Sequence, residues 1–486
     1  MKRASVYIIF LLVTMGNISA QQIDSLSVFN DSSQAIKHPW RAAFHALGLN
    51  AGVWAYNRFV DKAEYAKISF HRIGDNIKRG FLWDNDLFTS NMLLHPYHGS
   101  LNYSIARSNG LTFWESAPYP FIGSLAWEIC AETTPPSIND LFTTSFGGIA
   151  LGEVSYRLSS LVLDNSKRGA SRFFREFLGT VISPARGFNR LITGDAWKVS
   201  HKYYERHNNE KLPIKFVATV GDRYMAYGNS LFKEGNSPYM EFYLIYGDIL
   251  QDGMSKPFDY FKFISVLNLD GSQPFVGSLS LTAKLLGKYL EPFPGNKVLI
   301  GFFQHFDYYD SRLSINGSKN TPFKISEPAA LGLGIIYQLP VAKTVNIQQH
   351  VYLNGILLGA CLTDHYNLGR DYNMGSGYSI KSNSTVNFGK YGNLELNVHH
   401  FRIFTWKGYK ENDFENTSSA YLYLNTQGDK GNVSFTILNS RMSLNLGSNI
   451  ILNAGLYYYL RNTHYAHYED VFSRTSEVRL GLGYSF

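Results

Sequence analysis

The 486-residue chain has few charged residues and only two cysteines. Charged residues make up 17% of it, whereas an ordinary soluble domain has about 25%. Two cysteines exclude a disulfide-rich scaffold, and we expect no bond between Cys130 and Cys361. Lys2 and Arg3 contribute two charges to the formal net charge of +7. The remaining excess is too diffuse for a nucleic-acid binder, so we expect no nucleic-acid partner.

Several features of common membrane-protein and enzyme classes are absent as well. Beyond residue 20 the chain never offers the roughly 18 to 20 consecutive apolar residues that a membrane-crossing helix needs. It has no Gly-rich phosphate loop followed by Lys-Ser or Lys-Thr, no Gly-x-Ser-x-Gly elbow and no Cys-x-x-Cys pair. We therefore expect no cofactor and no bound metal.

Residues 1–20 have the pattern of a secretory signal peptide. Lys2 and Arg3 precede an apolar run from Val6 to Met15, and the small residues of Ile18-Ser19-Ala20 precede Gln21. No cysteine stands at this cleavage point, which excludes a lipoprotein. We predict that the chain is exported and that the mature protein begins near Gln21.

The C-terminal half is rich in aromatic residues and alternates with a period of two. The chain has 33 Tyr, 34 Phe and 42 Gly, a composition typical of β-structure with aromatic girdles. Near the C-terminus Val478, Leu480 and Leu482 share one face of a strand, and polar or small residues occupy the other. The strand ends at Phe486, and a terminal aromatic residue resembles the assembly signal of outer-membrane barrels. We expect the barrel-assembly machinery to be a partner.

Thirteen segments after residue 213 are strand candidates, and they predict an antiparallel barrel of about 12 or 14 strands because single-chain bacterial barrels have even strand numbers. These segments are 214–226, 237–248, 257–270, 274–287, 295–309, 323–338, 343–361, 376–388, 392–407, 417–427, 431–440, 443–460 and 473–486. The length of 443–460 suggests a strand that extends into an outer loop. The apolar face changes from even positions such as Leu396 to odd ones such as Phe401, which predicts a bulge near His399-His400. A soluble β-sandwich would also alternate, but its strands average only about 5 to 6 residues.

Residues 35–205 have a different, helical pattern. Helices are expected over 42–56, 86–107, 121–132 and 170–178, with Pro96 kinking or dividing the second. The fold class is thus α+β, with a signal peptide at 1–20, a helical domain at 21–205 and a transmembrane barrel at 206–486. We expect the helices to plug the barrel lumen or to cap its periplasmic mouth, because a barrel of 12 to 14 strands encloses more space than an 8-stranded one.

A further helix has the clearest start signal in the chain. Ser137 follows two prolines and can cap the helix, while Asp140 can reach back in a capping box. Thr144 and the Gly148-x-x-x-Gly152 motif give this helix a face of small residues that another helix can approach closely. Glu153 and Arg157 form an i,i+4 pair of favourable polarity.

Several motifs occur in order across this helical region. They are His95-Pro96-Tyr97-His98-Gly99, Arg107-Ser108-Asn109-Gly110, Trp114-Glu115, Trp127-Glu128, Pro136-Ser137-Ile138-Asn139-Asp140 and Gly147-Gly148-x-x-x-Gly152-Glu153. Together they resemble an uncharacterised outer-membrane family that is catalogued only as a domain of unknown function. The resemblance covers roughly residues 70 to 195. It implies an outer-membrane location and a barrel after the helices, and it implies no established activity.

The densest group of possible catalytic residues lies in the same region. His95 and His98 can present two imidazoles to one metal ion, and Glu128 and Glu132 share a helix face. A hydrolase acting on lipid would use such groups, with a histidine as general base and a carboxylate orienting it. The alternative is that these polar groups satisfy one another within a packed domain. A metal site would need a third or fourth ligand, which the sequence does not place.

Three functions are compatible with these observations. The preferred one is an outer-membrane barrel with a structural or passage role, plugged or capped by its helices. The second is an outer-membrane hydrolase acting on lipid or lipopolysaccharide, with catalytic candidates His95, His98, Glu128 and Glu132. The third is a binding module that uses the aromatic residues Tyr457–Tyr459 and Tyr465. In each case outer-membrane lipid and lipopolysaccharide are the expected surroundings, and the sequence does not specify an oligomeric state.

Overall fold

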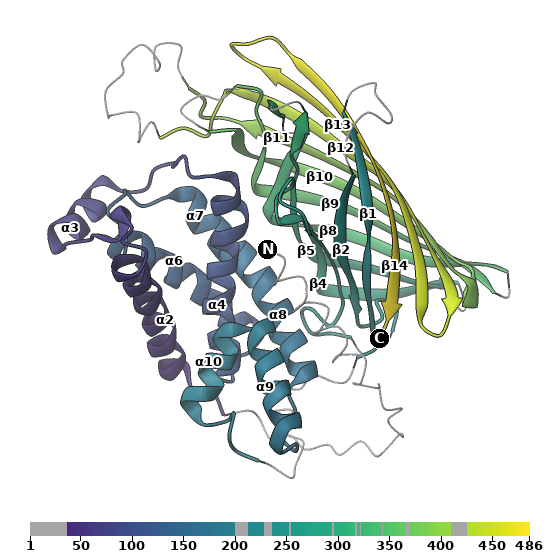
Figure 1. The fold of residues 1–486 in the computed structure, drawn as a ribbon, viewed down its shortest axis with the longest axis horizontal. Coiled ribbons are helices and arrows are strands. Elements are labelled where there is room, and N and C mark those ends of the chain that lie inside the picture. Colours follow the sequence, from purple (N-terminus) through teal and green to yellow (C-terminus); the bar gives the residue numbers. More distant parts are fainter. Residues whose placement is uncertain are drawn as a thin grey trace.

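The structure is a computed structural model that describes residues 36–199, 212–227, 236–251, 254–293, 296–315, 318–320, 322–342, 344–365, 370–409 and 425–486. A set of helices is followed by a closed antiparallel barrel (Figure 1), so the α+β class is confirmed. The predicted signal peptide at residues 1–20 lies outside the described residues.

The helical region begins at Pro39 and ends at Thr193. Its helices are α2 (Pro39–Phe59), η1 (Glu64–Ala66), α3 (Phe70–Arg79), η2 (Ser90–Leu94), α4 (His95–Ser108), α5 (Phe113–Ser116), α6 (Pro118–Cys130), α7 (Ile138–Phe142), η3 (Thr143–Gly147), α8 (Gly148–Val162), α9 (Gly169–Ile182) and α10 (Pro184–Thr193). None of the described helices is long and apolar enough to cross a membrane. The second predicted helix is divided next to Pro96, as expected: residues 90–94 form the π-helical turn η2, and α4 begins at His95, which places Pro96 in its first turn.

Helices α4 and α8 form the centre of this region, and glycine allows them to pack closely. A Cβ at Gly99 would collide with the carbonyl oxygen of Thr144, and one at Gly148 would overlap the backbone of Gly99. The ring of Tyr103 lies against Gly152. The small-residue face predicted on this helix is therefore where α4 packs.

The barrel has 12 strands in the closed order β1-β14-β13-β12-β11-β10-β9-β8-β5-β4-β3-β2. The strands are β1 (Ile214–Tyr227), β2 (Asn236–Tyr246), β3 (Phe261–Asn268), β4 (Val276–Phe293), β5 (Asn296–Asp310), β8 (Lys324–Ala342), β9 (Val345–Leu362), β10 (Tyr372–Asn387), β11 (Gly392–Thr405), β12 (Gly431–Gly447), β13 (Ile450–Tyr465) and β14 (Val471–Ser485). The short strands β6 (Leu313–Ile315) and β7 (Ser318–Asn320) form a separate hairpin.

The two ends of the barrel differ in their connections. One end, here called the turn end, has the short connections 294–295, 343–344, 388–391 and 448–449, and also the longer connection 247–260. The opposite loop end has the connections 228–235, 269–275, 311–323, 363–371, 406–430 and 466–470. Short turns at one end and longer loops at the other are typical of outer-membrane barrels.

Strand residues alternate between a largely polar lumen and an apolar outer face. Across the lumen Tyr243 donates a hydrogen bond to Glu395 at 2.7 Å, and Arg441 pairs with Glu241 at 2.7 Å. The outward positions carry exposed aliphatic side chains, among them Leu333, Leu353, Leu357, Leu456, Leu480 and Leu482. This is the side-chain arrangement of a transmembrane barrel.

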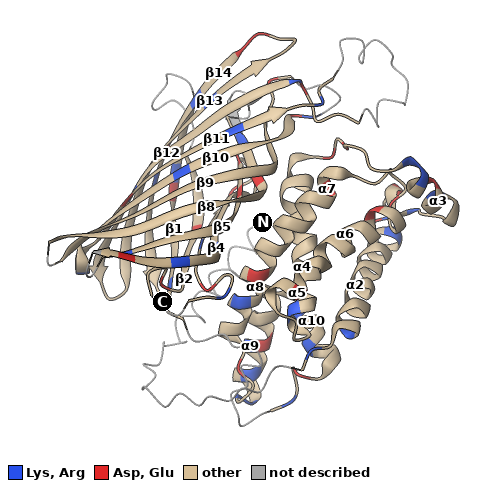
Figure 2. Cartoon of the chain, turned by 180° about the vertical axis from the view of Figure 1, so that it is seen from behind, with Lys and Arg blue, Asp and Glu red and all other residues tan. Residues whose placement is uncertain are grey.

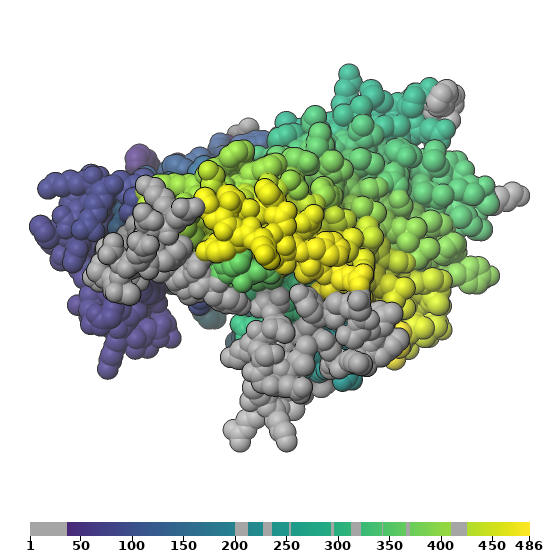
Figure 3. All heavy atoms as spheres, turned by 90° about the horizontal axis from the view of Figure 1, so that it is seen from above, coloured from purple at the N-terminus to yellow at the C-terminus, as the bar shows by residue number. Residues whose placement is uncertain are grey.

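The helical region packs against the outer wall of this barrel. On β5 the luminal residues His305 and Asp307 alternate with Phe306 and Tyr308, which join the helical residues Phe88, Met92 and Tyr103 in one hydrophobic core. Outward-facing Gln304 also donates a hydrogen bond to the carbonyl oxygen of Phe146 at 2.8 Å. Figure 1 shows the helices beside the strands, and in Figure 3 the purple N-terminal residues lie at one side of the green and yellow barrel residues. The predicted luminal plug is therefore wrong for the described helices, because they contact the outward-facing residues of the strands.

Two predictions about individual strands are also wrong. Strand β11 pairs with β10 and β12 without a register shift at His399-His400. Phe401 and Ile403 point into the lumen, where they belong to an apolar cluster, so the apolar residues change face although the backbone does not bulge. The predicted strand 443–460 is the end of β12, a tight turn at Ser448-Asn449 and most of β13. Most of the candidate strand 417–427 lies outside the described residues.

Candidate metal and acid-base site

Three helices of the helical region bring His95, Glu128 and Asp140 together. His95 is the first residue of α4, Glu128 lies near the end of α6, and Asp140 lies in the short helix α7. A π-helical turn adjoins two of them, since η2 ends just before His95 and η3 begins shortly after Asp140. Such turns in helical segments are frequent at functional sites.

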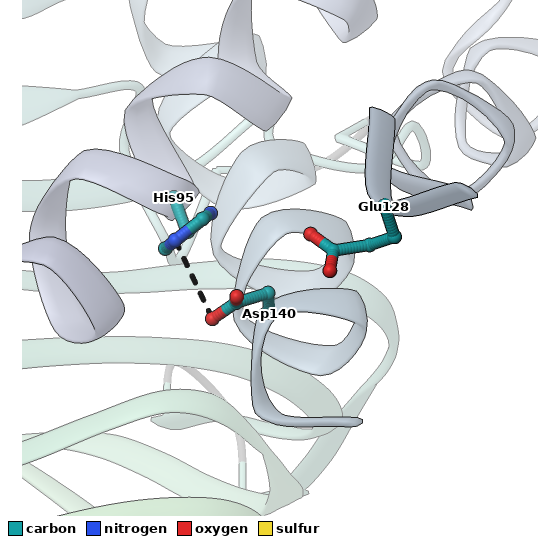
Figure 4. A group of neighbouring side chains, drawn as sticks. All are labelled: His95, Glu128 and Asp140. Atoms are coloured by element: carbon teal, nitrogen blue, oxygen red, sulfur yellow. Dashed lines mark ion pairs between the residues drawn. The ribbon is translucent and has the colours of Figure 1, made fainter. Parts of the chain in front are cut away.

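The three side chains converge on one point (Figure 4). One ligand atom from each residue lies within 4.8 Å of the others. The Nε2 atom of His95 is 3.4 Å from Oδ1 of Asp140. Glu128 and Asp140 are buried, with exposed fractions of 2% and 3%. One imidazole and two carboxylates are a donor set that divalent metal ions accept.

A second group of polar residues fixes Asp84 next to this cluster. The Oδ1 atom of Asp84 accepts hydrogen bonds from Asn139 at 2.8 Å and from Asn91 at 3.1 Å. Arg370, from the loop end of the barrel, donates to the backbone oxygen of Asp84 at 2.8 Å, and Tyr372 donates to that of Asp86 at 2.6 Å. The barrel thus helps to position the acidic segment of the site.

The concentration of carboxylates shifts their pKa values in opposite directions. Burial, and then the negative charges of neighbouring carboxylates, raise the pKa values of Glu128 and Asp140 well above their usual range. Burial and the charge of Asp84 raise the pKa of Asp86 to about 7. Burial alone would also raise the pKa of Asp84. Hydrogen bonds from Asp140, Asn139 and Asn91 outweigh this effect, so the pKa of Asp84 is lowered. A bound cation would relieve the repulsion among these groups.

A cavity of about 510 Å³ adjoins the cluster. Small-molecule sites commonly have volumes of about 300 to 1,000 Å³. Its wall is formed by Val53, Asn57, Tyr65, Leu82, Trp83, Asp84, Asn85, Asp86, Ser90, Leu94, His95, His98, Trp127, Glu128, Glu132, Thr134, Pro135 and Ser137. All of these residues belong to the helical region, so the cavity is separate from the barrel lumen.

All four catalytic candidates expected from the sequence line the cavity, but only one member of each pair belongs to the three-residue cluster. His98 lies in the cavity wall, but its Nε2 atom is 2.9 Å from Oδ1 of Asn50, and burial lowers its pKa to about 4. Glu132 accepts hydrogen bonds from Trp127 at 2.5 Å and Thr134 at 3.0 Å. Only His95 and Glu128 of the four catalytic candidates contribute to the three-residue cluster.

Sequence reasoning gave Asp140 a capping role and missed Asp84 and Asp86. Ser137 does cap α7, since its side chain accepts a hydrogen bond from the Asp140 backbone at 3.3 Å. The reciprocal bond is absent among the described residues, because the backbone N–H of Ser137 donates to Glu128 at 2.9 Å. Asp140 is therefore free to face His95. The signal that could have been used is the segment Trp83-Asp84-Asn85-Asp86, which leads into the second predicted helix.

Glu153 and Arg157 belong to a different network, away from the cavity wall. Glu153 is fully buried and pairs with Arg107 at 2.8 Å and with Arg157 at 2.7 Å, and it also accepts a hydrogen bond from Tyr103 at 2.9 Å. Arg157 donates in turn to the backbone oxygen of Pro257 in the barrel at 2.8 Å. This network holds α4 and α8 together and joins them to the connection 247–260.

Phe486 completes the end of the barrel. Its ring lies 5.2 Å from that of Phe216, and its backbone N–H donates to the Phe216 carbonyl oxygen at 3.0 Å. Recognition of Phe486 by an assembly machinery remains a prediction.

Residues 80–185 match the family model of a domain of unknown function, DUF3943. The resemblance identified in the sequence is thereby confirmed, and a 12-stranded barrel follows this domain. No curated protein matches the chain.

Several solved outer-membrane structures are similar to part of the chain. The NanC porin is 7% identical with a TM-score of 0.26, and the match covers 55% of this chain and 98% of that one. Omp33 of Acinetobacter baumannii is 8% identical with a TM-score of 0.23, covering 57% and 100%. OprD from Pseudomonas aeruginosa is 10% identical with a TM-score of 0.20, covering 57% and 95%. Scores this low carry no argument about function.

Proposed function

We propose that this protein is an outer-membrane enzyme whose helical region hydrolyses an ester of an envelope lipid or of lipopolysaccharide with the help of a divalent cation. The observation that carries the proposal is the convergence of His95, Glu128 and Asp140 beside a cavity of about 510 Å³ on the outside of the barrel. Of the functions expected from the sequence, this is the alternative rather than the preferred one.

An outer-membrane location is supported by the barrel itself. Its outward positions carry aliphatic side chains such as Leu333 and Leu480, and its charged residues meet inside. A closed barrel leaves no strand edge unpaired, which is a requirement for strands that cross lipid. Export through the signal peptide predicted at residues 1–20 is consistent with this location.

A passage role receives less support from the geometry of the lumen. Lys381 pairs with both Asp307 and Glu327 inside the barrel, and Arg479 pairs with Glu477 at 2.7 Å. Apolar rings, including those of Phe323 and Tyr459 at 4.0 Å, fill another part of the lumen. Solute passage would require these contacts to break, whereas chemistry at the helical site would not.

The residues of the cluster suggest how an ester would be cleaved. A cation bound by His95, Glu128 and Asp140 would polarise the ester and favour ionisation of a water molecule. Asp86 lines the same cavity, and its pKa of about 7 suits a group that accepts a proton near neutral pH. As the water oxygen bonds to the acyl carbon or phosphorus, Asp86 takes one proton. That proton passes to the leaving alcohol when the ester bond breaks.

Cation binding by the purified full-length protein tests the proposal. After dialysis against Zn²⁺, Mn²⁺ or Ca²⁺, we expect the intact protein to retain one equivalent of at least one metal, measured by elemental mass spectrometry. The variants His95→Ala and Asp140→Asn should lose it. His71→Ala is the matched control, because the side chain of His71 is 87% exposed and lies outside the cluster.

Hydrolysis should depend on the same residues. We expect the loaded protein to release a product from lipopolysaccharide or phospholipid in detergent, and His95→Ala to abolish release. Equal metal content in intact protein and His95→Ala, or no product with any of the three metals, would contradict the proposed function.

A further inference from the structure

We infer that the free apolar surface of the helical region is embedded in the lipid bilayer beside the barrel, where acyl chains cover α2, α9 and α10. This inference concerns where the helices lie and does not depend on the proposed chemistry.

The first observation is the extent of contact between helices and barrel. At the loop end, Asn91 donates a hydrogen bond to Tyr372 at 2.7 Å. At the turn end, Arg157 donates to Pro257 in the connection 247–260. The helical region therefore accompanies the strands between both ends of the barrel. It covers outward positions such as Leu281 and Leu358, which lipid would otherwise contact.

The second observation is an apolar stripe on each of the three helices. On α9 the stripe follows helical spacing, and Phe173, Phe174, Phe177 and Val181 are 65%, 61%, 50% and 54% exposed. No described residue buries these side chains. The stripe on α10 consists of Phe188, Leu191 and Ile192, and the stripe on α2 consists of Trp40, Phe44 and Leu47. Each of these side chains is at least 45% exposed.

The third observation is that the interior of the helical region contains buried charged groups and small residues at the contact between α4 and α8. Glu153 is 0% exposed, and Arg107 and Arg157 are 6% and 3% exposed. The centre of the α4–α8 contact is formed by Gly99 and Gly148 rather than by large apolar residues. Small residues and polar contacts between helices, with large apolar residues outside, are the pattern of helices packed in lipid.

Lipid rather than a protein partner is indicated by continuity with the barrel. The exposed stripes adjoin a barrel whose outward residues, including Leu333 and Leu353, are themselves suited to acyl chains. Figure 2 shows most charged positions of the helices near α3 at one end and near α8, α9 and α10 at the other.

Spin-label accessibility in liposomes tests the inference on the full chain. The exposed native cysteine is removed by Cys130→Ser, and the other native cysteine, Cys361, is buried and thus shielded from the label. Single cysteines for labelling are then introduced as Phe44→Cys, Phe177→Cys or Leu191→Cys. Leu333→Cys on the outer wall of the barrel is the lipid control. Glu469→Cys, exposed in the connection 466–470, is the water control. Accessibility is measured to oxygen, which partitions into lipid, and to a water-soluble nickel chelate.

We expect at least two of the three helix positions to match Leu333→Cys, with a ratio of oxygen to nickel accessibility several-fold above that of Glu469→Cys. A ratio like that of Glu469→Cys would overturn the inference, because the helices would then face water. Low accessibility to both reagents would also overturn it, because another protein surface would then cover the stripe. Neither result depends on whether the protein hydrolyses lipid.

Discussion

Burial decides what the charged residues of the helical region do. Glu153 was predicted to form an i,i+4 pair with Arg157, and the pair is present. The sequence did not indicate that the pair is inaccessible to water or that Arg107 contacts the same carboxylate from α4. A surface pair would contribute little, whereas loss of a charge from a buried network leaves its partners uncompensated.

We therefore predict that Glu153→Gln strongly destabilises the helical region. The substitution leaves Arg107 and Arg157 buried without a counter-ion, which typically costs about 3 to 5 kcal/mol. The free energy of unfolding can be measured by urea titration of the protein in liposomes. Glu64→Gln, which removes an exposed carboxylate, should have little effect. Equal stability of the two variants would show that the network does not support the fold.

The catalytic candidates also show that the sequence does not reveal which side chains meet in space. His95 and Glu128 could be selected because their chemistry is visible in the sequence. Asp140 was assigned to a helix cap, and its second role depends on Glu128 taking the hydrogen bond from Ser137. The hydrogen bond between Ser137 and Glu128 joins the start of α7 to α6, so local spacing could not predict it.

At the scale of elements, the predictions were best where the pattern was local. The alternation of apolar residues located most of the strands, and Ser137 marked the start of α7 correctly. The π-helical turns η2 and η3 have no simple sequence signal and were missed. At β11 the prediction failed because a luminal apolar cluster contains Phe401, and a pattern of apolar residues does not distinguish lumen from lipid.

The packing of α4 against α8 gives a test at this scale. We predict that Gly99→Ala destabilises the helical region, because the added Cβ would collide with the Thr144 carbonyl oxygen. Gly52→Ala is the matched control, since a Cβ at Gly52 of α2 would meet nothing within 4 Å. Thermal unfolding followed by circular dichroism should show a lower midpoint for Gly99→Ala alone. A lower midpoint for both variants would point to a general effect of removing helical glycines.

At the scale of the whole molecule, barrel and helices lie side by side rather than one inside the other. The sequence predicted both parts and their order, but it left open whether the helices plug the lumen or cap its periplasmic mouth, and it did not indicate packing against the outer wall. Cross-strand pairs such as Arg441 with Glu241 occupy part of the lumen, and a cavity of about 460 Å³ remains beside them at the turn end. Arg441 lies on β12 and Glu241 lies on β2, and these strands are far apart in the sequence. The pair across the lumen could therefore not be predicted from either strand alone.

This arrangement assigns separate roles to the two parts. The barrel has the outer face of a membrane-spanning barrel, and it contributes Arg370 and Tyr372 to the positioning of the acidic segment. The helical region carries the cavity and the cluster of His95, Glu128 and Asp140. We propose that envelope-lipid chemistry takes place in that cluster.

The most direct test is a mass profile of phospholipid and lipopolysaccharide from envelopes of cells with the intact gene, without it, or with a single variant. We predict that loss of the gene removes a lipid product, that the intact gene and His71→Ala restore it, and that His95→Ala and Asp140→Asn do not. Identical profiles in all strains, or restoration by His95→Ala, would contradict the claim.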